Sequence, residues 1–299
     1  FRRVLFRSKS VGIKFAMGMY SQNLLSAMSD RDVVNLFYGF LSGPDNLPDS
    51  FNGKPVTTRL QKARHAVTGF DYRVNKKQTI NIESFVKIFD QITNINRDKL
   101  FADDEFNLDK PKRLRQDFIV ENGNAYGGDI SYKYSDKHWY LWAVYSLTYV
   151  NRFDGITHYQ PNFDRRHNAN ILLNYEFDKK HPSEVSLRWN FGSGFPFTQT
   201  QGYYEKFNFQ QGIGTDYTAA NGQLGIVYAQ INRGRLPYYH RLDFSVRRKW
   251  VLREGSEFNL LFSITNVYNR NNIFYYDRVK AKRVDQLPIL PALGCNYSF

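Results

Sequence analysis

Cysteine is almost absent from this chain, which has a single one, Cys295, in 299 residues. A lone thiol excludes an intrachain disulfide and a thiolate metal cluster. Long apolar runs are missing as well, because no stretch approaches the roughly eighteen consecutive apolar residues that a membrane-spanning helix needs. The mean hydropathy is −0.55. A helical membrane protein and a disulfide-stapled scaffold are therefore both excluded.

Aromatic side chains are abundant by contrast, with 25 Phe, 21 Tyr and 4 Trp. Tyr and Trp combine an apolar body with a polar tip, which suits half-wet positions. With 42% hydrophobic residues the chain can bury a core, so a wholly disordered chain is excluded. A polar average with many aromatics is typical of the transmembrane β-barrel, whose strands alternate between lipid and lumen.

Alternation of period two runs through most of the chain. In residues 11–22, for example, Val11, Ile13 and Phe15 alternate with Gly12 and Lys14. This pattern predicts a half-buried strand. About ten such strands are expected, at residues 11–22, 66–74, 80–88, 130–134, 139–149, 169–177, 185–191, 242–250, 258–264 and 293–299.

The connections between these strands alternate strictly in length. Short turns are expected near residues 75–78, 135–138, 178–183 and 252–256. Long connections are expected at 23–63, 90–124, 151–166, 194–238 and 270–288, and residues 30–37 of the first suit a short helix. This asymmetry is typical of outer-membrane barrels, which have short periplasmic turns and long extracellular loops.

A soluble β-sandwich also shows alternation and turns. Three features favour the barrel. Tyr and Trp lie near the strand ends of the apolar face, the polar face carries charges of both signs, and the long connections all fall at one end. The sequence therefore predicts an all-β fold, an antiparallel transmembrane β-barrel.

Five segments carry a family resemblance, in order along the chain: residues 123–128 (GNAYGG), 192–197 (GSGFPF), 235–243 (RLPYYHRLD), 266–272 (NVYNRNN) and 287–294 (LPILPALG). Together they resemble the C-terminal barrel half of TonB-dependent outer-membrane receptors of the Bacteroidetes type. The resemblance covers residues 9–299. Residues 1–8 do not join the alternation and resemble a translated sequencing-adapter end, so we expect a non-native terminal scar there.

The resemblance implies a plugged barrel of about 22 strands, of which this chain would hold the last ten or so. It also implies substrate capture by the loops and lumen, with energy delivered by the TonB complex through an N-terminal plug. Residues 9–299 show neither a plug nor a TonB box. We therefore expect a fragment that does not transport alone.

Two groups of residues are expected to matter for assembly and for the lumen. Tyr297 and Phe299 end an alternating strand and resemble the C-terminal signal that the barrel assembly machinery recognises. Arg188, Arg241 and Asp243 are expected on the lumen face, where Arg241 and Asp243 are spaced to pair with each other.

The connection 194–238 is rich in aromatic and amide side chains, which suit sugars and flat chelates alike. From it we predict Phe197, Tyr203, Tyr204 and Tyr217 as substrate contacts. The alternative is that these side chains pack the loop onto itself.

The sequence gives no sign of an enzyme, a cofactor or a metal site. The six histidines are scattered without ligand spacing, and Gly192-Ser193-Gly194 is not followed by the helix that a nucleophile elbow needs. The net charge of +13 is spread without a basic block, so no nucleic-acid partner is predicted. We expect external cations such as Lys62 and Arg165 to neutralise lipopolysaccharide phosphates.

These observations predict TonB-dependent uptake of a scarce nutrient across the bacterial outer membrane. A siderophore, a cobalamin-like chelate and an oligosaccharide all stay open as substrates. The alternative is a smaller barrel that acts as a passive porin or a surface adhesin.

Overall fold

The computed structural model describes residues 2–8, 10–26, 40–42, 47–177, 182–206, 223–252, 256–278, 280 and 282–298. Within these ranges the regular structure is β, apart from two 3-10 helices, Glu105–Asn107 and Lys112–Leu114. No helix in the described ranges is long and apolar enough to cross a membrane. The helix expected at 30–37 lies outside the described residues.

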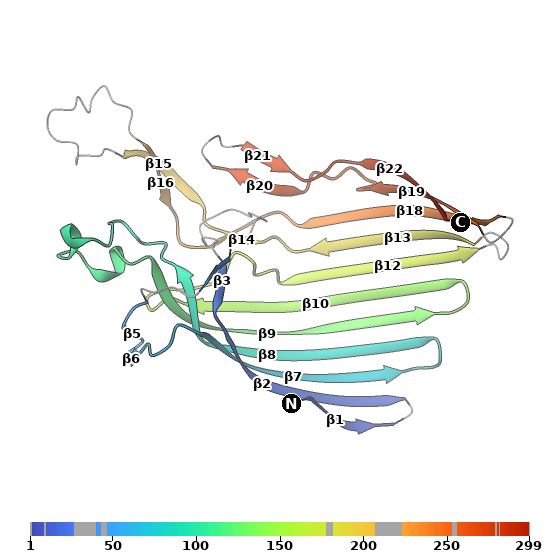
Figure 1. Ribbon diagram of the computed structural model, residues 1–299, viewed down its shortest axis with the longest axis horizontal. Coiled ribbons are helices and arrows are strands. Elements are labelled where there is room, and N and C mark those ends of the chain that lie inside the picture. Colours follow the sequence, from blue (N-terminus) through green and yellow to red (C-terminus); the bar gives the residue numbers. More distant parts are fainter. Residues whose placement is uncertain are drawn as a thin grey trace.

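One large antiparallel sheet dominates the structure (Figure 1). Each strand pairs with its neighbours in chain order, from β1 at one edge to β22 at the other, and the short β11 extends β10. The bounds are β1 Arg2–Arg7, β2 Val11–Gln22, β7 Gln61–Arg73, β8 Gln78–Ile95, β9 Phe118–Ser135, β10 Trp139–Phe153, β11 His158–Tyr159, β12 His167–Phe177, β13 Ser183–Gly192, β18 Tyr239–Val251, β19 Glu257–Thr265 and β22 Leu290–Ser298. The ten strands from β2 to β22 on the main path confirm the all-β prediction.

The two ends of the sheet differ. At one end, right in Figure 1, brief turns join β7 to β8 and β9 to β10. At the other end, left in Figure 1, the connections are long and carry small hairpins of their own. These hairpins pair β3 Leu24–Ser26 with β4 Phe40–Ser42, β5 Ser50–Phe51 with β6 Lys54–Pro55, β14 Pro196–Phe197 with β17 Gly234–Arg235, β15 Thr200–Lys206 with β16 Gln223–Tyr228, and β20 Ile273–Asp277 with β21 Lys282–Asp285.

Two expected loops contain more strand than the sequence pattern indicates. The connection expected at 90–124 shrinks, because β8 and β9 each run for 18 residues. That length spans roughly 60 Å, well beyond the 9–11 residues that cross a bilayer. In the described parts of the connection expected at 194–238, residues 194–206 and 223–238, β14 pairs with β17 and β15 pairs with β16. In both places, pairing with the neighbouring strand satisfies backbone groups that a loop would leave to water.

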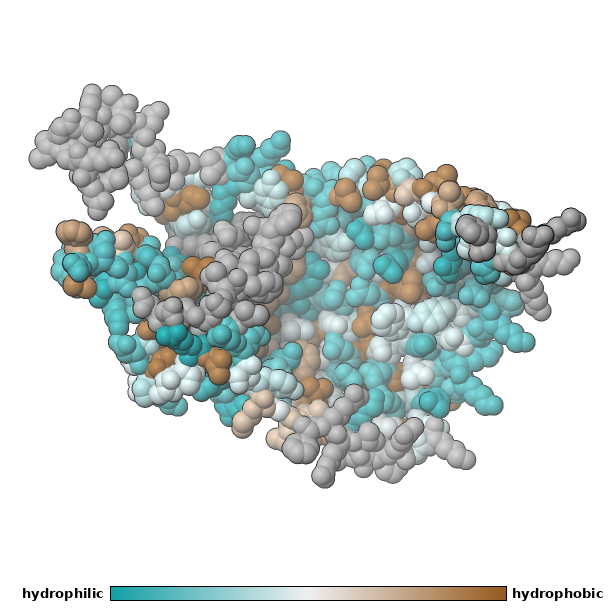
Figure 2. All heavy atoms as spheres, in the orientation of Figure 1, coloured by the Kyte–Doolittle hydropathy of each residue, from teal (hydrophilic) through white to brown (hydrophobic). Residues whose placement is uncertain are grey.

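Cross-strand register sorts the side chains into two faces. One ladder row is almost wholly apolar and runs Ile13, Phe70, Ile82, Ile130, Tyr145, Ala169, Phe191. The adjacent row, on the other face, is mainly polar and runs Gly12, Asp71, Asn81, Ser131, Val144, Asn170, Asn190, Arg241. Hydrophilic side chains predominate along the face of the sheet visible in Figure 2. The alternation predicted from the sequence thus holds from strand to strand.

The apolar face stays exposed in the sheet. Phe70, Ile82 and Ile130 expose 39%, 41% and 46% of their surface. The other sheets that the structure describes are two-stranded and too small to cover this face. The buried apolar side chains in the described ranges number six, including Ile92, Val120 and Tyr159, and they lie toward the long-connection end. Among the described residues, no second layer covers the apolar face of the sheet. This face therefore needs an apolar surrounding.

The segment Arg2–Arg7 forms the edge strand β1 and pairs with β2 from Arg2 opposite Ala16 to Arg7 opposite Gly12. An edge strand needs only a backbone in register, which most sequences supply. The pairing therefore leaves the non-native origin of residues 1–8 as a prediction.

A charge placed on the apolar face should be far more harmful than the same charge on the polar face. Ile171 lies in the middle of β12, in the row with Ala143 and Trp189, whereas Asn170 points to the other face. In lipid vesicles we expect Ile171→Arg to destabilise the protein by about 2–4 kcal/mol and Asn170→Arg by less than about 1 kcal/mol. Urea unfolding of the protein in lipid vesicles measures both. Equal losses would contradict the assignment of the faces.

Candidate ligand-binding site at the long-connection end

Two adjacent cavities lie where the hairpins of the long connections meet. The larger, of about 660 Å³, is lined by Phe197, Tyr203, Tyr276 and Arg278 among others. The smaller, of about 280 Å³, is lined by residues that include Arg165, Phe195, Tyr238 and Tyr239. Leu236 and Ile273 border both cavities. Cavities of this size, with aromatic walls and a few polar groups, suit a small ligand.

Glycines of the 192–197 segment make this arrangement possible. A Cβ at Gly192 would lie 2.5 Å from the guanidinium of Arg165. The guanidinium therefore occupies the space that a side chain at position 192 would fill. A Cβ at Gly194 would collide with the carbonyl of Leu236. The chain therefore needs glycine at Gly194, where the overlap is with backbone, whereas a side chain at Gly192 would displace the guanidinium of Arg165.

Arg165 is the most unusual side chain of the smaller cavity. Its guanidinium stacks 4.1 Å from the ring centre of Phe195 and 5.5 Å from that of Tyr239. Its Nε is buried without a hydrogen-bond partner among the described residues. Burial lowers the pKa of this guanidinium, although an arginine stays charged in proteins. The arrangement presents a fixed positive charge against aromatic rings.

A buried ion pair fixes the base of the β14–β17 hairpin. Asp164, only 1% exposed, binds the guanidinium of Arg235 at 2.6 Å. The same guanidinium donates hydrogen bonds to the backbone carbonyls of Asp164 at 2.9 Å and Gly194 at 3.2 Å. The backbone N–H of Val150, on β10, donates to the Asp164 carboxylate at 3.1 Å. The hairpin is thus held to the main sheet.

Contacts across the larger cavity tie two hairpins together. The hydroxyl of Tyr203, on β15, donates a hydrogen bond to the carbonyl of Arg278, which follows β20. The Arg278 side chain donates to the hydroxyl of Thr200 at 2.8 Å and lies 5.3 Å from the ring centre of Tyr228. The larger cavity is therefore a pre-formed pocket between two connections that are distant in sequence.

Of the four predicted substrate contacts, Phe197 and Tyr203 line the larger cavity. Tyr204 is 46% exposed, and its ring lies over Gly225. It is not among the residues that line that cavity. Tyr217 lies outside the described residues. The sequence pattern did not single out Tyr276 or Arg278, because only the tertiary fold brings the last long connection beside the fourth.

Arg188, Arg241 and Asp243, predicted on the lumen face, lie close together on neighbouring strands. Arg188 is opposite Asp243 in the ladder of β13 and β18, so all three share one face. Arg241 and Asp243 form an ion pair at 2.9 Å. The other oxygen of Asp243 accepts the backbone N–H of Asn266 at 3.0 Å. These contacts stabilise the strand ends around the lumen-type polar face.

The predicted assembly signal is described only in part. Tyr297 lies on the edge strand β22, opposite Phe258, and is 53% exposed. Phe299 lies outside the described residues. An exposed aromatic on an unpaired edge is available for strand addition, so the role of this terminus stays a prediction.

A buried charge network closes the other side of this end. Arg97 and Glu121 expose 4% and 0% of their side chains and pair at 3.0 Å. Arg97 also pairs with Asp154, which is 4% exposed. The hydroxyl of Tyr159 lies 2.8 Å from both oxygens of Glu121, and its ring stacks 4.6 Å from Arg97. The network joins the connection 96–117 to the ends of β9 and β10.

The environment of Arg97 and Asp154 favours their charged forms. Burial opposes the charge of Arg97, but the neighbouring Tyr159, Glu121 and Asp154 outweigh it and raise the pKa of Arg97. Burial likewise opposes the ionisation of Asp154, yet the backbone N–H groups of Thr157 and Ile156, together with Arg97, hold its pKa below the ordinary value. A buried pair of this kind is costly to break from one side.

The charged groups that line the two cavities are of one sign. Their charged lining residues are arginines, and no carboxylate lines either one. Within the ranges that the structure describes, no group of three His, Cys, Asp or Glu side chains is placed to hold a metal ion. Arginines beside aromatic rings suit anionic or aromatic ligands.

The architecture defines a class of protein: a curved antiparallel sheet with one apolar and one polar face and with long connections at one end, as in a segment of an outer-membrane barrel. Comparison with known family models and with characterised protein sequences gave no match.

Solved structures give the particular likeness. The whole chain superposes on 36% of the ferric preacinetobactin receptor BauA from Acinetobacter baumannii, with 12% identity and a TM-score of 0.57. It also superposes on 36% of the ferric yersiniabactin uptake receptor FyuA from Yersinia pestis, with 11% identity and a TM-score of 0.54. The chain therefore has the fold of part of the barrel of TonB-dependent siderophore receptors and spans about a third of their length.

Removing the arginine of the buried network should release the connection 96–117. Arg97→Met leaves Glu121 and Asp154 buried without their cation, a loss of about 3–5 kcal/mol. We expect protease cleavage within 96–117 to accelerate about 100-fold or more. The matched control is Lys110→Met, in the same connection, whose pair with Asp109 is exposed and contributes less than about 1 kcal/mol. Similar cleavage rates for both variants would contradict a structural role of the network.

Proposed function

We propose that this chain is the C-terminal part of the barrel of a TonB-dependent receptor that takes up a scarce nutrient across the bacterial outer membrane. The observation that supports this most is the superposition of the whole chain on the barrels of two ferric-siderophore receptors. The exposed apolar face adds support, because lipid is the surrounding that suits it.

The open sheet supports a larger barrel. The strand order is linear, and β1 and β22 lie at opposite edges. Unpaired backbone groups at such edges are not tolerated in the hydrocarbon of a bilayer. In the proposed receptor, further strands pair with these edges, a plug fills the lumen, and the TonB complex acts through that plug. The barrel assembly machinery would recognise the strand that ends in Tyr297 and Phe299.

The candidate site favours an anionic chelate among the three substrate classes. Arg165 and Arg278 present guanidinium groups beside the rings of Phe195 and Tyr228. Planar cations of this kind bind carboxylate and phenolate oxygens and stack on flat ligands. A neutral oligosaccharide would leave the buried charge of Arg165 unused. In this function the protein binds and moves its substrate and carries out no chemistry on it.

Growth on single nutrients tests this function. A strain that lacks the gene should lose growth on one ferric chelate as sole iron source, and the intact gene should restore it. Uptake should stop when the proton-motive force is collapsed, since TonB transmits that energy. Uptake that persists without the proton-motive force would support a passive porin and contradict the proposal.

The arginine of the smaller cavity gives a sharper test. Arg165→Gln removes the charge while keeping a polar side chain, so we expect about 10-fold weaker binding of the ferric chelate, which corresponds to the loss of one charge-assisted contact. The control is Lys76→Gln, which removes a charge from the turn between β7 and β8 at the far end of the sheet. Unchanged chelate affinity in Arg165→Gln would rule out this cavity as the site.

The orientation of the sheet is testable on whole cells. In a Cys295→Ser background, single cysteines replace Asn75 and Lys137 in short turns and Phe106 in a long connection, where Phe106 is 93% exposed. We expect a membrane-impermeant maleimide to label only the cysteine at position 106, because long connections face the outside in such barrels. The reverse labelling pattern would invert the proposed orientation.

A further inference from the structure

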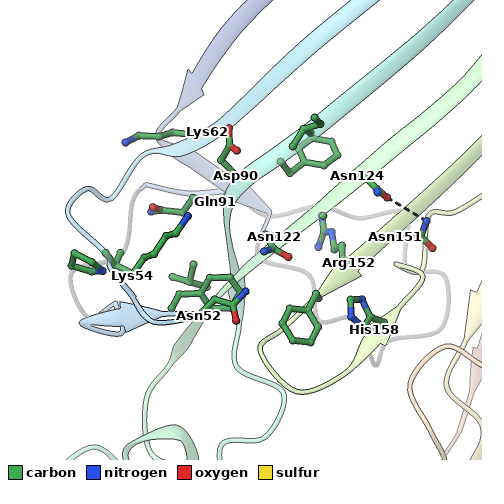
Figure 3. Close-up of a pocket in the computed structure, with 18 of the residues that line it drawn as sticks. Asn52, Lys54, Lys62, Asp90, Gln91, Asn122, Asn124, Asn151, Arg152 and His158 are labelled. Atoms are coloured by element: carbon green, nitrogen blue, oxygen red, sulfur yellow. Dashed lines mark hydrogen bonds between the residues drawn. The ribbon is translucent and has the colours of Figure 1, made fainter.

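A third cavity has a volume of about 630 Å³. Figure 3 shows residues that line it, among them Arg152, whose guanidinium lies 3.6 Å from Glu121 of the buried network. The walls of the cavity come from the hairpin β5–β6 and from the ends of β7, β8, β9, β10 and β11. It shares no lining residue with the two cavities of the candidate ligand site. We call it the amide pocket, after its lining residues Asn52, Gln91, Asn122, Asn124 and Asn151.

The register of the sheet shows on which face the amide pocket lies. Asn124 is opposite Ile88 and Asn151, two residues along from the row of Val86, Tyr126 and Tyr149. Residues two apart in a strand share a face. That row continues the apolar face of Ile82, Ile130 and Tyr145. The asparagines therefore lie on the same face of the sheet as the apolar rows, closer to the long connections.

Next to the amide pocket, neighbouring residues of β9 point to opposite faces of the sheet. Glu121 points to the polar face and is locked in the buried network, whereas its neighbour Asn122 lies opposite Phe153 on the outward face. The side-chain amide of Asn122 has no hydrogen-bond partner in the part of the chain that the structure describes. The network borders the amide pocket through Arg152, which lines the pocket and lies 3.6 Å from Glu121.

The position of the pocket along the strand matches the head-group region of a membrane. Tyr126 and Tyr149 stack with ring centres 5.4 Å apart, as in the aromatic girdles that mark the membrane interface. At the rise of a strand, Asn124 lies about 7 Å beyond this pair and Asn122 about 14 Å beyond it. A group held by these asparagines would lie directly above the lipid chains.

The chemistry of the pocket suits a phosphorylated sugar. Amide groups bind sugar hydroxyls, and the stacked rings of Phe153 and His158, 4.4 Å apart, offer an aromatic wall. Lys54 and Lys62 are exposed and have no carboxylate partner among the described residues. Asp90 is the one acidic residue lining the pocket, and Arg64 already pairs with it at 2.6 Å. The pocket is therefore left with unpaired positive charge.

We propose that the amide pocket binds the phosphorylated sugar head group of the glycolipid that forms the outer leaflet, lipopolysaccharide. This rests on the proposed location in the outer membrane and goes beyond the proposed transport. The amides and rings hold the sugar, and Lys54 and Lys62 bind its phosphates. The bound lipid then packs its chains against the apolar face below the Tyr126–Tyr149 pair.

Binding is tested with the protein extracted from its own outer membrane in mild detergent. The probes are nanodiscs of lipopolysaccharide, nanodiscs of phosphatidylglycerol, and the soluble phosphorylated core oligosaccharide. We expect lipopolysaccharide to bind at least 10-fold more tightly than phosphatidylglycerol. The double variant Lys54→Glu/Lys62→Glu and the variant Asn122→Leu should each lose this preference. Lys76→Glu, at the opposite end of the sheet, is the matched control and should keep it.

Three results would overturn the proposal. Equal binding of both nanodiscs that is unaffected by Asn122→Leu would show a general charge effect. Equally tight binding of the soluble oligosaccharide would assign the pocket to free sugar phosphates. The variant Lys62→Arg keeps the positive charge. If it loses the preference for lipopolysaccharide although its heat-dependent gel mobility shows that it is folded, phosphate binding by Lys62 is excluded. If the intact gene supports no chelate uptake while its protein still binds lipopolysaccharide selectively, only the transport function is refuted.

Discussion

The exposed apolar face of a single-layered sheet is the constraint on which the rest of the structure depends. Rows of partners such as Ile13, Phe70, Ile82 and Ile130 remain in register across the strands. With no second large sheet among the described elements to bury them, these side chains gain stability only from an apolar surrounding. In the proposed outer-membrane location, lipid meets that need, and the opposite face is free to carry ion pairs such as Arg241–Asp243.

The long-connection end is organised by a different principle. A few buried ion pairs hold its described parts. On one side Arg97 pairs with Glu121 and Asp154, and on the other Asp164 pairs with Arg235. Such pairs contribute little net stability, but they are costly to break from one side, so they fix geometry. They fix the walls of the cavities, and in the proposed functions the aromatic rings and cations of those walls select the ligand.

Much of the fold was predictable because strand periodicity is a local property. The alternation in residues 11–22 and 139–149 predicted both the strands and their faces, and Asp243 and Arg241 paired as their spacing implied. The ends of β8 and β9 were not predictable, because the last residues of each strand are held by pairing with the other strand rather than marked by an alternation of apolar and polar residues. Arg165 and Arg278 were missed as site residues for the same reason, because nothing local marks a cation that another segment will surround.

The sequence by itself determined the class of architecture: a period of two, brief turns alternating with long connections, and an apolar face too continuous to stay in water. Tertiary structure decided where binding chemistry lies. Gly192 seats Arg165, Tyr203 meets Arg278 across two hairpins, and Asn122 turns outward while Glu121 turns inward. The physical reason is that alternation needs only neighbours in sequence, whereas a pocket needs segments that the chain brings together from far apart.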